Sequence, residues 1–237
     1  MNSKPKRPRP TSRRPPDVEA GDLIASFRQR ADDAAEPYLY SDADLLRFAS
    51  EAEREACLRA RLLWDETTFT IPVLANTALY ALDQLIDRIE RATFTAASGG
   101  RPRDLDLAGA DVLAESSEWQ SQSGRPECAV QKDRTLRLWP TPGATYAGAL
   151  TLSVYRFPLS PMESTSDEPE IPLEHHDGLV DWMLFLAYTT KDSETNDPAR
   201  AARHEALFAA RFGERPSADV LRRHRERRRV TTRYGGM

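Results

Sequence analysis

The sequence predicts an α+β protein, in which a helical bundle formed by N- and C-terminal helices carries an inserted antiparallel β-sheet or sandwich domain. Apolar residues recur at helical spacing near both ends of the chain, from residue 41 to 64 and from 174 to 212. Between these stretches, short segments alternate apolar and polar residues with the period of a β-strand. Helices on either side of a strand-rich region indicate that the two helical ends meet, with the sheet inserted between them.

Residues 1–20 are expected to form an extended basic arm. Five of the first sixteen residues are proline, and proline disrupts the interior of helices and sheets. Asp22 is the predicted N-cap of a short helix that ends by Pro37. The residues expected on the inner side of this helix follow helical spacing: Ile24, Phe27 and Ala31.

A longer helix is predicted from its N-cap, Ser41, through Trp64. Asp42 and Asp44 favour the positive end of its dipole. Its apolar face contains Leu45, Phe48, Ala49, Ala52, Ala56 and Leu63. The opposite face is charged and is expected to form ion pairs at spacings of three and four residues, through Glu51, Arg54, Glu55 and Arg59. Residues 21–67 therefore form the first helical part.

From residue 68 the pattern is that of short strands, and we assign residues 68–157 to the inserted β domain. The expected strands are Thr68–Val73, Leu79–Leu82, Ile89–Thr95, Glu127–Gln131, Thr135–Trp139 and Ala149–Phe157. A short helix or turn is expected over Asp111–Trp119. Tight turns between short strands, such as the one at Pro140–Gly143, favour antiparallel pairing.

Residues 158–172 contain four prolines and are expected to form an extended linker. The second helical part, residues 173–216, follows this linker. Its first helix is predicted from Glu174 to about Thr190, and the run Trp182–Tyr188 is apolar on nearly every side. Such a helix is expected to be buried all round.

The next helix is predicted to begin at Asp197, with proline at its first position, and to end before Gly213. Its expected inner face contains Ala202, Ala206, Phe212 and either Phe208 or Ala209. After a break at Pro216, a strongly basic helix is expected over Ser217–Arg229. This helix belongs to a basic C-terminal arm, residues 217–237.

The net charge of −4 on the 237-residue chain is divided unevenly. Residues 1–16 carry six Lys or Arg and no acid, and residues 221–237 carry seven Arg and one Glu, so each tail has a net charge of +6. Residues 17–220 carry 20 basic and 36 acidic residues, a net charge of −16. This asymmetry is typical of tails that bind a partner of opposite charge, although solvated tails without a partner have the same composition.

Several functional classes lack their sequence patterns. The longest apolar run is too short to cross a bilayer, and the basic N-terminus lacks the apolar stretch of a secretory signal. Cys57 and Cys128 cannot form a disulfide framework or a four-ligand zinc site, so we expect reduced core cysteines. No glycine-rich phosphate loop or serine-nucleophile motif is present in the sequence. We therefore expect a protein that is neither secreted nor membrane-spanning.

Two groups of residues are candidates for a chemical site. His175, His176 and Asp177 come closest to a metal site, but adjacent histidines on a helix diverge by about 100°, and no third ligand has a suitable spacing. Asp181, in the buried helix, is a candidate catalytic carboxylate, for which a paired structural charge is the simpler interpretation. We predict that the protein is not an enzyme, and we assign no catalytic, cofactor-binding or metal-binding residue.

A series of short motifs occurs in a fixed order between Asp22 and Gly213. They are Tyr40-Ser41-Asp42, Leu45-Leu46, Tyr80 to Asp83 with Ile86 and Ile89, Trp119, Gly124 to Pro126, Leu136 to Pro142, Leu152 to Arg156 with Pro158-Leu159, Asp167 to Pro172, His176 to Leu179 with Ala187-Tyr188, Asp192 to Glu194, and Phe212-Gly213. In these motifs the chain resembles the head-to-tail adaptor proteins of tailed bacteriophages, the ring-forming connectors beneath the portal. The tail tubular adaptor of short-tailed phages is the most similar kind.

The resemblance implies a structural role without catalysis or cofactor, in a ring of typically twelve copies around the DNA channel. The implied partners are the portal protein, a tail nozzle or tail tube protein, further copies of the chain, and genomic DNA that passes without sequence-specific binding. The implied location is the neck or tail of the virion, after assembly in the host cytoplasm, with no membrane contact. Adaptor C-termini contact the portal, so the predicted portal-docking arm contains Arg222, Arg223, Arg225, Arg227, Arg228, Arg229 and Arg233. The proline-rich N-terminal arm is not part of the resemblance.

Two other functions stay open from the residues alone. The first is a nucleic-acid-binding accessory protein that acts through the Arg-rich C-terminal tail, and the second is a small enzyme with an unrecognised site. Arginines bind phosphates, but the tail has Tyr234 as its one aromatic residue and the rest of the chain is acidic. An acidic body suits a channel that DNA must slide through, and it equally keeps a subunit soluble before assembly.

Overall fold

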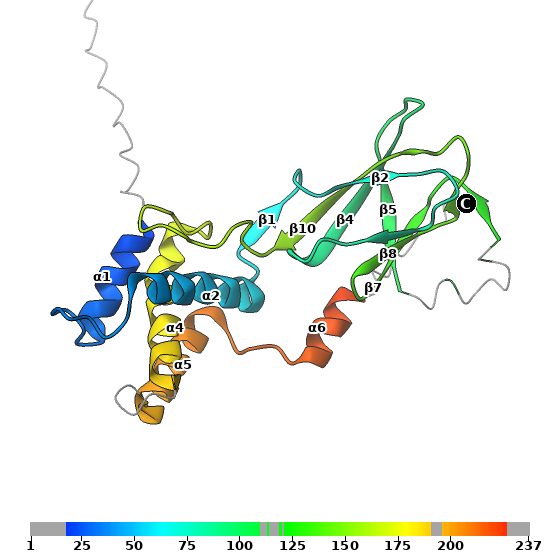
Figure 1. Ribbon diagram of the computed structural model, residues 1–237. Coiled ribbons are helices and arrows are strands. Elements are labelled where there is room, and N and C mark those ends of the chain that lie inside the picture. Colours follow the sequence, from blue (N-terminus) through cyan, green and yellow to red (C-terminus); the bar gives the residue numbers. More distant parts are fainter. Residues whose placement is uncertain (1–17, 110–112, 114–118, 120, 191–195, 227–237) are drawn as a thin grey trace, which may run out of the picture.

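The computed structural model describes residues 18–109, 113, 119, 121–190 and 196–226. Figure 1 shows a group of helices and a sheet, which are connected near β1 (Leu63–Asp65) and β10 (Gly148–Arg156). The α+β class predicted from the sequence is confirmed, while the predicted domain boundaries stay a prediction. Among the described residues, none of the helices combines the length and the apolar character that crossing a membrane requires.

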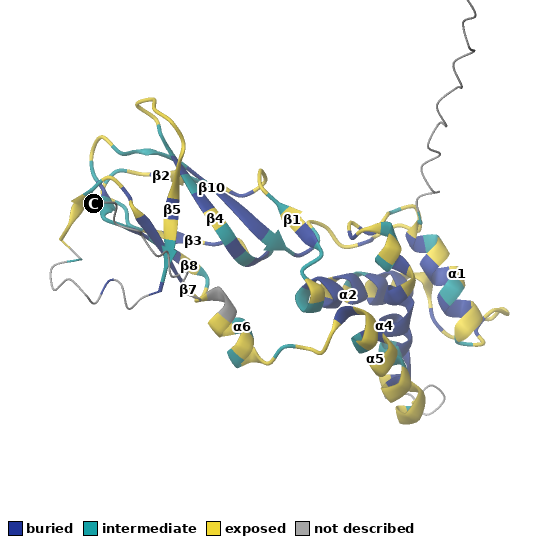
Figure 2. Ribbon diagram, turned by 180° about the vertical axis from the view of Figure 1, so that it is seen from behind, coloured by how far each residue is buried: buried dark blue, intermediate teal, exposed yellow. Residues whose placement is uncertain are grey.

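Four helices from the two ends of the chain share one hydrophobic core: α1 (Ala20–Arg30), α2 (Asp42–Ala60), α4 (His176–Thr189) and α5 (Pro198–Phe212). A short 3-10 turn, η1 (Leu173–His175), leads into α4, which packs against the other three helices. In this core the Phe208 ring centroid lies 4.9 Å from that of Trp182 and 4.5 Å from that of Phe212. Figure 2 shows the buried surface concentrated where these helices face one another. The burial of α4 on nearly every side explains its apolar sequence.

The strands form one curled eight-stranded sheet in the order β1-β10-β4-β5-β7-β8-β3, with β2 paired to β10 along the same edge as β1. The remaining strands of this sheet are β2 (Thr70–Val73), β3 (Leu79–Ala81), β4 (Ile86–Ala96), β5 (Arg103–Ala108), β7 (Cys128–Lys132) and β8 (Thr135–Trp139). A separate two-stranded pair consists of β6 (Ser123–Gly124) and β9 (Thr141–Pro142). Side chains such as Val73, Phe94, Leu136 and Leu152 form a second core within the large sheet.

The prediction of a purely antiparallel sheet is wrong, because β5 pairs in parallel with β7 and β6 pairs in parallel with β9. The sequence does not predict β5, since Arg103, Asp104 and Asp106 make it a polar segment in which Leu105 is the buried residue. A strand without apolar alternation gives little signal of its pairing partner. Of the helix or turn expected over Asp111–Trp119, the described residues include Leu113 and Trp119, and the rest lies outside them.

The first two helices differ from the prediction at their ends. Glu19, not Asp22, is the N-cap of α1, and Asp22 accepts the Glu19 N–H at 3.1 Å from within the first turn. This helix ends at Arg30, several residues before Pro37. In α2 the predicted cap is confirmed, because the Ser41 hydroxyl accepts the Asp44 N–H at 3.1 Å.

The end of α2 lies at Ala60 rather than at Trp64. Arg61 takes the left-handed conformation, with φ of 51°, which stops the helix and turns the chain into β1. Leu63 then pairs with Arg156 of β10. The predicted helix included the start of β1, because Leu63 continues the helical spacing of apolar residues.

The ends of α5 agree with the prediction, since the Asp197 side chain accepts the Ala199 and Arg200 N–H groups and Gly213 follows the last turn. The buried residues of α5 are Ala201, Phe208 and Phe212. The predicted inner residues Ala202 and Ala206 are exposed, because the face defined by the two phenylalanines lies on another side of the helix.

The predicted extended linker, residues 158–172, contains no helix or strand but is folded back on itself. A Glu170 carboxylate oxygen accepts the Leu159 N–H at 2.5 Å, which brings the two ends of the segment together. The Met162 N–H donates to the Ser50 hydroxyl of α2 at 2.9 Å, and Met162 is buried. Hydrogen bonds to α2 therefore turn this segment into a loop packed on the helices, and we call residues 158–172 the strap loop.

We predict that Phe48→Ala lowers the free energy of unfolding by about 3–5 kcal/mol. Phe48 is 6% exposed in the helical core, and its ring packs edge-on against Tyr40 with centroids 6.2 Å apart. Denaturant unfolding measures the change. Leu207→Ala is the control, because Leu207 of α5 is 43% exposed, and it should cost less than about 1 kcal/mol. A cost near zero for Phe48→Ala would contradict its burial in this core.

Candidate interaction surfaces

The described part of the C-terminal arm contains the helix α6 (Ala218–Arg225), which contacts β4. Ser217 caps this helix by accepting the Val220 N–H at 3.3 Å. Arg222 and Arg223 both pair with Asp219, and their side chains are 61% and 77% exposed. The structure thus places these two predicted docking residues together on a short exposed helix. Of the other predicted docking residues, Arg225 is described by its backbone alone. The rest lie outside the described residues: Arg227, Arg228, Arg229 and Arg233.

The chain that leads to α6 is fastened to α2 by a buried arginine. Arg59 pairs with Glu55 at 2.8 Å and donates to the Gly213 carbonyl at 3.2 Å, and its side chain is 1% exposed. Its guanidinium lies 4.8 Å from the centre of the Trp182 ring. Glu55 also pairs with Arg215 at 3.5 Å. These contacts fix the point at which the C-terminal arm leaves the helices.

The predicted ion pairing on the charged face of α2 is confirmed at Glu55 and Arg59, and this face is only partly exposed. Glu51 and Arg54 are exposed, but Glu55 is buried and the Arg59 side chain is enclosed. The reason is that both α4 and α5 contact α2, so more than one face of the helix is covered. The spacing of four residues predicts the ion pair but carries no information on its burial.

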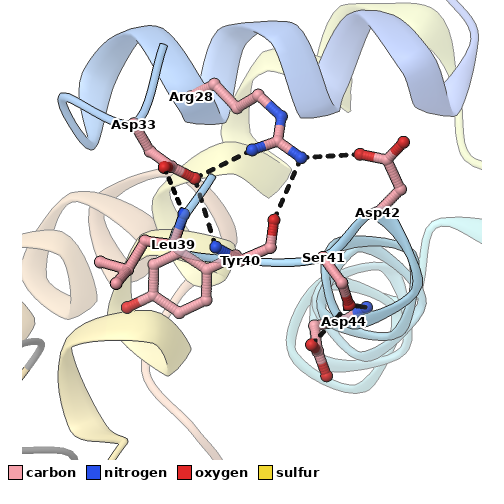
Figure 3. A network of polar contacts seen from close by, with 7 residues as sticks. All are labelled: Arg28, Asp33, Leu39, Tyr40, Ser41, Asp42 and Asp44. Carbon is pink, nitrogen blue, oxygen red and sulfur yellow. Dashed lines mark hydrogen bonds and ion pairs between the residues drawn. The ribbon is translucent and has the colours of Figure 1, made fainter. Parts of the chain in front are cut away.

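A second polar cluster fixes the connection between α1 and α2, as Figure 3 shows. The Arg28 guanidinium, on a residue 9% exposed, donates to Asp33 at 2.9 Å, to Asp42 at 2.7 Å and to the Tyr40 carbonyl at 3.1 Å. Asp33 in turn accepts the Leu39 N–H at 2.7 Å. One buried arginine therefore joins the end of α1, the loop and the start of α2. Nothing in the sequence pattern distinguishes Arg28 from a solvent-exposed arginine.

The loop held by Arg28 exposes two large side chains at its tip. Tyr38 is 45% exposed and Leu39 is 52% exposed. The Arg28 guanidinium carbon lies 3.7 Å from the centre of the Tyr38 ring, a cation–π contact that fixes the ring. Exposed apolar side chains on a loop positioned by a rigid scaffold are typical of contact surfaces. We therefore treat this tip, residues 38 and 39, as a second candidate interaction surface.

The helices and the sheet meet at Arg156, the last residue of β10. Its guanidinium donates to Asp65 at the end of β1 at 2.9 Å and to Glu170 of the strap loop at 2.6 Å. Burial raises the pKa of the Asp65 carboxyl. Hydrogen bonds from the Thr68 and Thr67 N–H groups, from the Thr68 hydroxyl and from Arg156 outweigh burial and hold this pKa at about 2. Nearby, Arg61 at the end of α2 pairs with Asp87 of β4 at 3.3 Å. The Arg156–Glu170 pair thus joins the sheet to the strap loop, and the Arg61–Asp87 pair joins the end of α2 to the sheet.

Glu53 of α2 places a carboxyl group behind the strap loop. It is 2% exposed and accepts the Ile171 N–H at 3.1 Å. Burial is the main cause that raises the pKa of Glu53 to about 7, and the charge of Glu170 acts in the same direction. Hydrogen bonds from the strap-loop backbone and the charge of Arg156 oppose this rise. Glu53 therefore changes its charge near neutral pH.

The residues that the sequence offered as candidates for a metal or catalytic site contact structural partners in the fold. His176 Nε2 lies 2.8 Å from the Ile171 carbonyl, so this nitrogen carries a proton, while His175 packs against the Phe212 ring. Asp181 lies 3.2 Å from His204, in agreement with a paired structural charge. Within the described ranges, no group of three or more His, Cys, Asp or Glu side chains is arranged to hold a metal ion.

Both cysteines are buried and free, as expected from the sequence. Burial raises the pKa of the Cys57 thiol far above its usual range, and it raises the pKa of Cys128 to about 11. Because the thiolate is the nucleophile, neither side chain is suited to nucleophilic chemistry at neutral pH.

The comparison with protein families identifies one relationship. A sequence profile of the family described as SU10 adaptor protein matches residues 18–233 of this chain. The match covers the helices, the sheet and α6, and it does not include residues 1–17. No curated protein matches the chain in sequence.

We predict that Glu53→Gln stabilises the protein more at pH 8 than at pH 5. The pKa of Glu53 is raised from its ordinary value of 4.5 to about 7 in the folded state. The folded state thus favours the protonated carboxyl, and the associated stability is complete below pH 4.5 and is lost as the pH rises through 7. Glutamine keeps an acceptor for the Ile171 N–H without the charge. The gain at pH 8 should exceed that at pH 5 by about 1–3 kcal/mol.

Denaturant unfolding of both proteins from pH 5 to pH 8 checks this expectation. Glu51→Gln is the matched control, because Glu51 lies on the same helix and is exposed. A stability difference between Glu53→Gln and the parent chain that does not change with pH would contradict the assignment.

Proposed function

We propose, because this chain belongs to the SU10 adaptor protein family of phage head-to-tail adaptors, that its copies form a ring between the portal and the tail, around the channel through which DNA passes. The family is structural, and its members act in the neck of the virion, in contact with portal, tail components and each other. The observation that carries the proposal is the match over residues 18–233, which spans the helices and the sheet together.

The finer parts of the proposal concern composition and partners. We propose about twelve copies in the ring, the portal on one side, and a tail nozzle or tail tube protein on the other. The subunits assemble in the host cytoplasm and carry out no catalysis. The net charge of −16 on residues 17–220 supports the passage of DNA without sequence-specific binding, since an acidic wall repels phosphate.

The C-terminal arm is the proposed portal-docking segment. Arg222 and Arg223 stand exposed on α6, and Asp219 is their carboxylate partner within the helix. Exposed pairs of this kind are weak, so a partner carboxylate can replace Asp219 at little cost. Arginine suits such exchange because its planar guanidinium binds carboxylates through two hydrogen bonds. Arg59, which anchors Gly213, sets where each arm starts, and repetition around a ring adds many weak contacts.

A nucleic-acid-binding accessory protein is the alternative. The observation that favours it is the net charge of +6 on residues 221–237, which also suits phosphates. Under this alternative the arm binds duplex DNA with an affinity that falls steeply as the salt concentration rises. Under the adaptor proposal the arm binds the portal.

We predict that a chain truncated after Val220 stays folded but does not join portal-containing particles. The truncation removes the arginines of the arm and leaves the helical core and the sheet core complete. Circular dichroism and denaturant unfolding check the fold, and the copy number of the protein in purified particles measures incorporation. The double variant Arg200→Ala/Arg203→Ala is the control, because it removes two exposed arginines from α5 and leaves the arm unchanged. It should incorporate normally.

Normal incorporation of the truncated chain would contradict portal docking by the arm. If that chain also lost salt-sensitive binding to duplex DNA, the nucleic-acid alternative would explain the arginines.

A further inference from the structure

A groove of about 340 Å³ lies between α2 and the first residues of the strap loop. Its surface is mostly apolar, and its lining includes Glu51, Leu85, Pro158, Leu159 and Pro161. Leu159 is 44% exposed in its wall. Exposed proline and leucine side chains along one groove form a surface suited to other apolar side chains.

The groove continues along the strap loop into an acidic hollow. Ser160 and Pro161 line both spaces, and the hollow adds the carboxylates of Glu163 and Glu168 and that of Glu170, which is already paired with Arg156. Residues 158–172, the strap loop, contain four Asp or Glu and no Lys or Arg. An apolar groove that runs into a field of carboxylates fits an extended segment that carries both apolar rings and positive charges.

The polypeptide enters the fold beside this hollow. The Ala20 N–H donates to the Asp167 carbonyl at 2.7 Å, and the Gly21 N–H donates to the Thr165 carbonyl at 2.8 Å. A Cβ atom on Gly21 would lie 3.1 Å from the Thr165 carbonyl oxygen, so the absence of a side chain permits this close approach. The start of α1 is thus bound to the strap loop, and the N-terminal arm extends from this point.

The sequence of the arm has the two properties that the groove requires. Residues 4–16 contain five prolines and six Lys or Arg, with no acidic residue. Proline-rich segments favour the polyproline II conformation, in which thirteen residues span about 40 Å at ~3.1 Å per residue. We propose that residues 4–16 bind in this groove of the same chain, with proline rings against Leu159 and the groove prolines and with Lys and Arg near the strap-loop carboxylates.

The attachment of the arm favours the same chain as the source of the bound segment. Exposed ion pairs are weak one by one, so a free peptide of this composition would bind weakly. A segment tethered next to its binding site has an effective concentration in the millimolar range, which makes weak contacts sufficient. The proposal concerns the isolated subunit, and it does not depend on the adaptor function or on the portal.

Disulfide trapping in the full-length, unassembled chain tests this inference. The variant Arg9→Cys/Leu159→Cys places one thiol in the arm and one in the groove wall. The control Arg9→Cys/Leu207→Cys places the second thiol on α5, at a leucine that is 43% exposed and so matches Leu159 at 44%. The native thiols of Cys57 and Cys128 are buried and do not compete at neutral pH. Mass spectrometry after mild oxidation at low protein concentration measures the rate of intrachain disulfide formation.

The inference predicts a rate at least tenfold higher for the groove pair than for the control pair, and a decrease of at least fivefold in that rate at 1 M salt. Equal rates for the two pairs would overturn it. A product that joins two different chains would also overturn it, because the arm would then bind a neighbour. A fast groove reaction that salt does not slow would contradict the role given to the carboxylates.

Discussion

At the end of β10, the guanidinium of Arg156 bonds to Asp65 of the sheet and to Glu170 of the strap loop, with its side chain 12% exposed. The same Glu170 accepts the Leu159 N–H, which closes the strap loop on itself. The next residue along, Ile171, donates its N–H to Glu53 of α2. Sheet, strap loop and helices therefore depend on a continuous series of polar contacts that begins at one arginine. Loss of one partner from such a partly buried set leaves the others uncompensated, which is costly.

The two basic arms of the chain begin at different places on the acidic body. All charged residues of the strap loop are acidic, and the start of α1, from which the N-terminal arm extends, is bound to this loop. The C-terminal arm leaves elsewhere, next to Gly213, where Arg59 and Glu55 hold it to α2. The two basic arms thus start from fixed and different places on an acidic body.

Local sequence signals predicted much of this fold. Ser41 and Gly213 mark helix ends because capping chemistry depends on nearby residues. Alternating strands such as β8 and β10 are equally local. In contrast, the sequence predicts neither the polar strand β5 nor its parallel pairing with β7, since both depend on residues far away in sequence. For the same reason the sequence did not predict the buried roles of Arg28 and Arg59, which tertiary packing alone determines, and the docking role of Arg222 and Arg223 stays a prediction from their charge.

The central claim is that Arg156 makes the sheet and the helices one cooperative structure. Native-state hydrogen exchange of the parent chain and of Arg156→Met tests it most directly, through amides in β4 of the sheet core and in α4 of the helical core. In the parent chain, the amides of β4 and of α4 should exchange with the same opening free energy. In Arg156→Met, the opening free energy of β4 should be lower than that of α4 by at least about 1 kcal/mol. Opening free energies that already differ in the parent chain, or that stay equal in Arg156→Met, would contradict it.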